Sequence, residues 1–239
     1  YPAEVAIVWP LTTAVHDRRG PALGDSMGIW LALTHAHIPV DPLDEGFLLS
    51  EDLSQYKVIY ISGAGLRRDV SQRLAEWVRG GGTLYSGGGS MRYDEGRRPL
   101  DAIRNLMGLQ ERMPLQAGEG VSVKGGGEFG SFELISQYEP LKPSKGAEIL
   151  ATFEDGSPAL IRNRHGRGQA ITCAFMPGRE YRVPLNKPNE DGSMNMEDTV
   201  DDSRGAYITA HLQSHVAPVV DTGKACVEGN LLRHPESGK

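Results

Sequence analysis

The feature that most constrains the fold is a repeated order in which a short apolar run ends in glycine and a helical pattern follows. Residues 58–61 lead into Ser62-Gly-Ala-Gly65, and residues 83–85 lead into Ser86-Gly-Gly-Gly-Ser90. Apolar, β-branched runs of this length are typical of buried strands. Strand–helix–strand order therefore predicts an α/β protein whose sheet is mainly parallel and covered by helices on both faces.

The remaining patterns extend this prediction in both directions along the chain. Residues 5–9 predict another buried strand, and residues 21–35 predict a helix with Met27, Leu31 and Thr34 on one face and Trp30 beside them. Further helices are expected at 69–79, 99–107 and 203–216. Residues 120–124, 148–153, 159–162 and 169–175 predict short strands, joined in part by the turn sequences Asp155-Gly156 and His165-Gly-Arg-Gly168. These strands indicate an antiparallel extension of the sheet.

Composition and charge limit the partners of the chain. The 239 residues carry a net charge of −6, which gives nucleic acid or an anionic membrane surface no electrostatic attraction. No apolar run is long enough to span a bilayer. We expect a soluble protein, either cytoplasmic or secreted with its signal removed, so the compartment stays open. Cys173 and Cys226 are too few for a disulfide framework, and we expect Cys173 to be structural.

Three segments in order resemble one family. Tyr56-Lys-Val-Ile-Tyr-Ile-Ser-Gly-Ala-Gly65 and Leu74-Ala-Glu-Trp-Val-Arg-Gly-Gly-Gly-Thr-Leu-Tyr85 resemble the strands and helix around the nucleophile elbow of class I glutamine amidotransferase-like domains. The stretch from Asp155 to Phe175 resembles a hairpin of the β-galactosidase trimerisation domain, found in glycoside hydrolase family 42 and its relatives. The resemblance implies a flavodoxin-like or amidotransferase-like three-layer fold with a mainly parallel sheet and an antiparallel extension.

The departures from that family concern its catalytic residues. An active amidotransferase places a cysteine on the elbow, because its reaction needs an exposed thiolate beside an oxyanion site. This chain has Gly88 at the corresponding position. The family's base follows a late strand as Phe-His-Pro-Glu, but this chain has Phe175-Met-Pro-Gly178. Methionine cannot accept a proton and glycine cannot orient a base. The resemblance therefore implies a domain without the family's chemistry.

The candidate site residues follow the two glycine turns, because ligands bind at the carboxyl ends of parallel strands. Ser90 is a weak candidate for a hydrolase nucleophile. The wider set of candidate ligand-binding residues is Ser62, Gly63, Gly88, Ser90, Arg92, Asp94 and Glu95. We expect no cofactor and no metal: His211 and His215 are four residues apart but lack the glutamate of a zincin. The sequence His234-Pro-Glu236 matches the His-Pro-Glu of the amidotransferase catalytic residues, but its surroundings indicate a turn.

The preferred hypothesis is a non-catalytic structural or oligomerisation domain of a larger carbohydrate-related protein. Residues 1–220 would form the amidotransferase-like domain, and 221–239 would begin a following strand or domain. Its expected partners are other domains of the longer chain, a further copy of itself, or a sugar. Two alternatives stay open: a hydrolase that uses Ser90, and a small-ligand or sugar-binding module at the strand ends. The polar segment 182–202 is expected to be an exposed loop whose apolar residues dock on a neighbour.

Overall fold

The described residues form one nine-stranded sheet with helices on both faces. The computed structural model describes residues 2–17, 20–185, 202–212 and 215–220. The strands are β1 (Val5–Trp9), β2 (Val40–Asp44), β3 (Val58–Ile61), β4 (Thr83–Ser86), β5 (Ser122–Lys124), β6 (Phe132–Glu133), β7 (Glu148–Phe153), β8 (Pro158–His165) and β9 (Gly168–Cys173). The helices are α1 (Leu11–His16), α2 (Ala22–His35), α3 (Glu45–Ser50), α4 (Arg68–Arg79), α5 (Asp101–Leu106), α6 (Pro177–Leu185) and α7 (Asp202–Thr209), with a 3-10 turn at Ala210–Leu212.

The strand order is β2-β1-β3-β4-β9-β8-β7-β5-β6. Within the described residues, the four pairs from β2 to β9 are parallel and the four from β9 to β6 are antiparallel. The α/β class and the antiparallel extension are confirmed. The sheet as a whole is mixed, however, and the prediction of a mainly parallel sheet was too strong. The tight turns at Gly156 and Gly166 explain this, because they reverse the chain into hairpins and leave no crossover helix.

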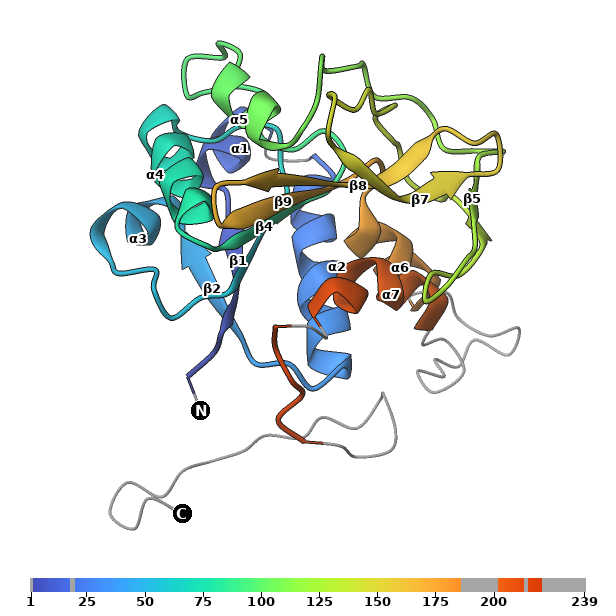
Figure 1. Ribbon diagram of the computed structural model, residues 1–239, viewed down its shortest axis with the longest axis horizontal. Coiled ribbons are helices and arrows are strands. Elements are labelled where there is room, and N and C mark those ends of the chain that lie inside the picture. Colours follow the sequence, from blue (N-terminus) through green and yellow to red (C-terminus); the bar gives the residue numbers. More distant parts are fainter. Residues whose placement is uncertain (1, 18–19, 186–201, 213–214, 221–239) are drawn as a thin grey trace.

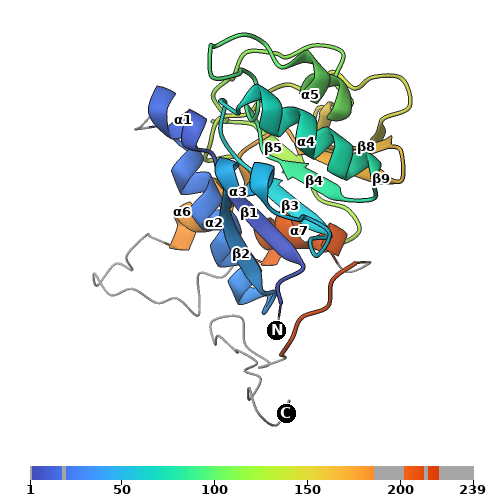
Figure 2. The same cartoon turned by 90° about the vertical axis from the view of Figure 1, so that its left-hand side faces the viewer.

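Helices cover the sheet in two layers (Figures 1 and 2). Helices α3, α4 and α5 lie on one face, and α2, α6 and α7 lie on the other. Two strand tyrosines attach α7 to the second face. The hydroxyls of Tyr60 and Tyr85 donate hydrogen bonds to the carbonyl oxygens of Ile208 and Tyr207, each at 2.7 Å. No helix in the described part of the chain has the length and apolar character needed to cross a bilayer.

The face of helix α2 that packs against the rest of the protein is not the face that the sequence pattern predicted. Its buried residues include Asp25, Ser26, Gly28 and Ile29, whereas Met27 and Trp30 are 43% and 44% exposed. The reason is the close contact between α2 and α6. A Cβ atom on Gly28 would lie 1.8 Å from the carbonyl oxygen of Gly178, so only glycine allows the two backbones to meet there. Met27 and Trp30 are thereby turned outward, whereas Ile29 and Leu33 are fully buried.

Five elements were not predicted: α1, β2, α3, β6 and α6. Strand β2 contains Pro42, which is tolerated because β2 lies at the edge of the sheet. Helix α6 runs from Pro177 to Leu185, so residues 182–185 are helical and the predicted loop 182–202 was wrong in its first part. Residues 186–201, together with 221–239 and the His234-Pro-Glu236 sequence, lie outside the described residues.

Candidate functional site

The predicted site residues gather at the carboxyl ends of β3 and β4. The loops after these strands are hydrogen bonded to each other: Met91 N donates to Gly63 O at 2.7 Å, and Arg92 N donates to Ala64 O at 2.7 Å. Gly63 has a φ of 117°, which other residues rarely adopt, and this lets the loop pass close to α1. The structure therefore brings the two predicted loops together at one end of the parallel strands.

Position 88, where an amidotransferase would carry its cysteine, has no room for a side chain. A Cβ atom on Gly88 would lie 2.1 Å from the backbone oxygen of Ala174. Gly88 N also donates to Phe175 O at 2.7 Å, which holds the elbow against the end of β9. Backbone atoms on both sides of this contact cannot yield as a flexible side chain would. The elbow is therefore closed at the position where the family places its nucleophile.

Position 178, which the sequence resemblance aligns with the glutamate of an amidotransferase, is also closed by backbone. Gly178 lies in the first turn of α6, where a Cβ atom would be 1.9 Å from the carbonyl oxygen of Asp25. The Asp25 side chain accepts hydrogen bonds from Gly178 N at 2.7 Å and from Arg179 N at 3.1 Å. Asp25 thus caps α6 and stabilises its positive end.

Ser62 is bound to the same buried aspartate. Its hydroxyl donates to Oδ2 of Asp25, and both side chains are buried. Burial raises the pKa of Asp25 to about 6, although the hydrogen bonds from Ser62, Arg179 and Gly178 lower it in part. Asp25 had no recognisable motif in the sequence, because its partners are 37 and about 150 residues away.

The backbone donor beside the elbow is occupied by a carboxylate. Gly89 N donates to Oε2 of Glu139 at 3.1 Å, and Met113 N donates to Oε1 at 3.1 Å. Arg112 makes a bidentate pair with the same carboxylate at 2.8 and 2.7 Å, and Arg92 Nη1 lies 3.2 Å from it. In an amidotransferase such a donor would stabilise a reacting oxyanion. Here the Glu139 side chain accepts the hydrogen bond of this donor.

Ser90 follows this occupied donor and is buried. Its residue is 1% exposed, and its carbonyl oxygen accepts from Arg112 Nη2 at 2.8 Å. Its backbone N–H donates to Gly87 O at 3.2 Å. The residue is therefore held within the turn and is not presented to solvent, unlike the nucleophile of a hydrolase elbow.

Asp94 and Glu95 fix the loop after the elbow to the start of α4. Asp94 pairs with Arg68 at 2.7 Å and with Arg98 at 2.9 Å, and Glu95 Oε2 accepts from Arg68 N at 2.9 Å. Burial raises the pKa of Asp94, but hydrogen bonds from Arg98, Arg68 and Gly96 outweigh this, and the pKa falls to about 2. Both carboxylates have internal partners, so the loop is ordered by its own charges.

A pocket of about 370 Å³ opens at this edge, beside the predicted residues but not among them. Thr13 anchors its rim, because its hydroxyl donates to Gly65 O and accepts from Gly65 N, both at 2.8 Å. Tyr93 supplies an aromatic ring that is 40% exposed. The pocket is lined by Thr13, His16, Asp17, Ala64, Gly65, Tyr93 and Arg97.

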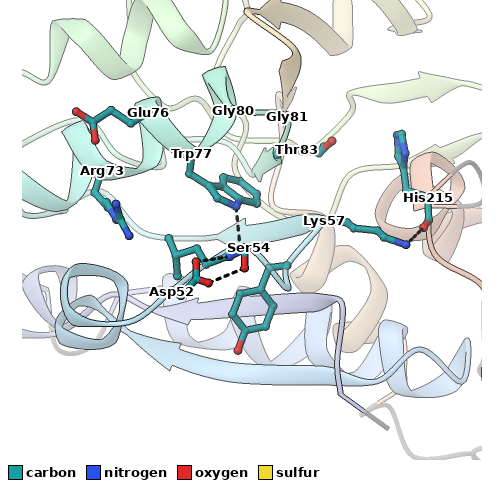
Figure 3. Close-up of a pocket in the computed structure, with 13 residues that line it drawn as sticks. Asp52, Ser54, Lys57, Arg73, Glu76, Trp77, Gly80, Gly81, Thr83 and His215 are labelled. Atoms are coloured by element: carbon teal, nitrogen blue, oxygen red, sulfur yellow. Dashed lines mark hydrogen bonds between the residues drawn. The ribbon is translucent and has the colours of Figure 1, made fainter.

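A second pocket, of about 520 Å³, lies at the opposite end of the parallel strands (Figure 3). It is lined by residues before β3, the second half of α4, and the turn at 80–82. Two of its polar groups have internal partners: Lys57 Nζ donates to His215 O at 3.0 Å, and Trp77 Nε1 donates to Leu53 O at 3.3 Å. Because it mixes acids and bases, its charge favours neither anions nor cations.

Of the two histidines, His211 contacts side chains of the protein interior, whereas His215 is exposed. His211 Nε2 lies 3.1 Å from the Tyr60 hydroxyl, and its ring stacks on Tyr85. Burial lowers the pKa of His211 to about 3, with a smaller contribution from His215, which is exposed. Over the described ranges, no three His, Cys, Asp or Glu side chains are placed to share one metal ion.

Comparison with known proteins gives a family for this arrangement. Residues 27–187 match the model of the β-galactosidase trimerisation domain. The chain is 28% identical to β-galactosidase Pbg of Clostridium perfringens, over 74% of this chain and 29% of that protein. It therefore spans less than a third of the length of this relative.

Solved structures share the fold. A catalytic mutant of Gan42B, a GH42 β-galactosidase from G. stearothermophilus, superposes with a TM-score of 0.70 at 20% identity, over 92% of this chain and 31% of that one. The β-galactosidase of Bacillus circulans sp. alkalophilus gives 0.69 at 22%, over 93% and 32%. An exo-β-1,4-mannosidase from an Opitutaceae bacterium gives 0.60 at 22%, over 76% and 32%. Since the family model covers most of the chain, this protein belongs to the β-galactosidase trimerisation domain family.

Proposed function

We propose that this chain is a non-catalytic assembly domain of a longer carbohydrate-active protein. The observation that supports this most is the closed elbow, where the Gly88 backbone lies against Ala174 and Glu139 fills the neighbouring donor. A domain with no space for a nucleophile contributes by another route. The family description names that route as trimerisation.

We further propose that the scaffold is amidotransferase-like and flavodoxin-like in its parallel half. The order β2-β1-β3-β4-β9 is the 2-1-3-4-5 order of flavodoxin-like doubly wound sheets. The glycine elbow follows β4, and the helix that would carry the base pair follows β9. On this account the protein keeps the framework of an amidotransferase and has lost its chemistry, as a pseudoenzyme.

The hydrolysis of sugars would belong to parts of the longer protein outside this chain. The chain covers 29% to 32% of the relatives described above, whose names specify β-galactosidases and a mannosidase. Two different sugars among relatives of one domain indicate that the domain does not set the substrate. We take residues 1–220 as this domain and 221–239 as the beginning of the next.

A second candidate function is binding of a sugar or another small ligand at the strand ends. The 370 Å³ pocket favours it, because the exposed ring of Tyr93 offers a surface on which a sugar ring can stack. A hydrolase based on Ser90 or Ser62 has less support. Ser90 is buried in its turn, and the Ser62 hydroxyl is bound to Asp25.

Turnover and ligand assays separate these functions. For an assembly domain we expect glutamine and p-nitrophenyl esters to be hydrolysed at the background rate by the wild type and by Ser90→Ala alike. Ester hydrolysis that is lost in Ser90→Ala would instead support the hydrolase. A rise in Tm with galactose or mannose that is lost in Tyr93→Ala would support the binding module.

A further inference from the structure

The outer face of α2 carries an apolar stripe with no partner in the described structure. Leu23, Met27 and Trp30 are spaced four and three residues apart, which places them on one side of the helix. They are 48%, 43% and 44% exposed. The opposite side of α2 is fully used, because it packs on α6 and on the sheet. Among the described residues, the stripe is therefore not covered by any other part of the fold.

Helix α1 and the end of β1 continue this surface. Trp9, Leu11 and Val15 are 38%, 48% and 81% exposed. Only residues 17–21 separate α1 from α2, and both views place α1 beside the first turn of α2 (Figures 1 and 2). We call the surface formed by Trp9, Leu11, Val15, Leu23, Met27 and Trp30 the α1–α2 face.

The α1–α2 face has the size of one side of a protein interface. Six large side chains, each about half exposed, present on the order of 500 Å² of apolar surface, about the largest patch that a monomer usually exposes. A standard interface covers about 800 Å² on each partner, of which somewhat over half is apolar. Two of the six residues are tryptophans, the residue type most enriched where binding energy is concentrated.

The face is held rigid from beneath, which reduces the entropy lost on docking. Helix α1 is fixed to α3 because the Thr12 N–H and hydroxyl donate to Glu45 at 2.7 and 2.8 Å. Helix α2 is fixed by the glycine contact of Gly28 with Gly178. The 370 Å³ pocket, which Thr13 and His16 of α1 help to line, can receive a side chain of a docking partner.

We propose that a second copy of this chain docks on the α1–α2 face. This rests on the proposed assembly function and names the surface that carries it. The six residues that define the face are uncharged, so burying them opposes the mutual repulsion of two chains that each carry a net charge of −6. The area fits a protein partner of ordinary size, and the family description specifies association between copies.

Sedimentation velocity of the 239-residue chain over a concentration series tests the proposal. The test variant is Met27→Asp with Trp30→Asp, which places charges in the centre of the face at exposed positions. The matched control is Ile149→Asp, an apolar residue of β7 that is 50% exposed and lies in the antiparallel extension. We expect association to weaken about tenfold or more in the double variant and to be unchanged in the control. Circular dichroism and Tm establish that each variant is folded.

The outcomes separate this inference from the proposed function. If the wild type associates and the folded double variant associates equally well, the α1–α2 face is wrong while the assembly function stands. A wild type that stays monomeric at every concentration overturns both, and would indicate that another domain of a longer protein covers the face. Weakening of the control to the same degree as the double variant also overturns the choice of surface.

Discussion

The Glu139 carboxylate accepts a hydrogen bond from the backbone nitrogen of Gly89 at 3.1 Å, in the glycine turn that follows β4. Arg112 and Arg92 hold the carboxylate there, and Glu139 is only 2% exposed. This contact ties the loop before β7 to the elbow after β4. The turn after β4 is thereby held in place by an internal ion pair.

Removing the charge of Glu139 is expected to destabilise the protein. In Glu139→Gln the two arginines lose their anionic partner in a largely buried place, which costs about 3 kcal/mol of the free energy of unfolding. Urea denaturation measures this value. The control is Glu154→Gln, at an exposed position, which should change it by less than about 0.5 kcal/mol. Equal stability of the two variants would show that Glu139 is not a structural anchor.

A smaller side chain at the same position is expected to open an anion site. Glu139→Ala leaves Arg112, Arg92 and the Gly89 N–H facing an empty space of carboxylate size. We expect formate or acetate to raise the Tm of this variant and leave that of the wild type unchanged at equal ionic strength. Chloride at the same concentration is the control. An equal response of both proteins would argue against a preserved anion cradle.

Introducing a side chain at position 88 of the elbow is expected to destabilise the protein. Gly88→Ala places a Cβ atom against the Ala174 oxygen, and we expect a loss of about 3 kcal/mol or failure to fold. The control is Gly126→Ala, since a Cβ atom at position 126 meets no atom within 4 Å. Gly88→Cys should accordingly gain no glutaminase activity. A stable Gly88→Ala protein would mean that the elbow is more open than described.

Asp25 predicts a pH dependence of stability with a definite sign. Its pKa is about 6 in the folded protein, against 3.8 as the reference value. The folded state therefore holds an extra proton between these values, so stability from this group is present below pH 4 and lost as the pH rises through 6. Asp25→Asn keeps the hydrogen-bonding shape without the titration. We expect the free energy of unfolding of the variant minus that of the wild type to rise by about 2 kcal/mol from pH 4 to pH 7. A flat difference would contradict the burial of this carboxyl.

Much of the fold could be predicted from local patterns. Three short apolar runs were predicted as strands and are strands in the structure: Val5–Trp9, Val58–Ile61 and Thr83–Ser86. Runs of this kind are typical of buried strands. Strand β2 was missed because Asp41 and Pro42 break that pattern at an edge where they are tolerated. The orientation of α2 was missed because it depends on the contact of Gly28 with Gly178, 150 residues further along the chain.

The sequence predicted which two loops lie together, but not the contacts that hold them. The glycine turns located the carboxyl ends of β3 and β4, and position 88 showed that the family's cysteine is absent. What the sequence could not provide is the set of long-range partners. Glu139 is 50 residues from Gly89, and no short motif marks a carboxylate that fills a distant donor. Single-sequence patterns report neighbours along the chain, and this site is built from neighbours in space.

The most direct test of the central claim is the mass of the purified 239-residue chain in solution by sedimentation equilibrium. One chain has a mass of 26.0 kDa. An assembly domain should show a weight-average mass that rises with concentration toward a multiple of that value. A mass that stays at 26.0 kDa at every concentration, together with thiol-sensitive hydrolysis of glutamine by the same preparation, would contradict the account.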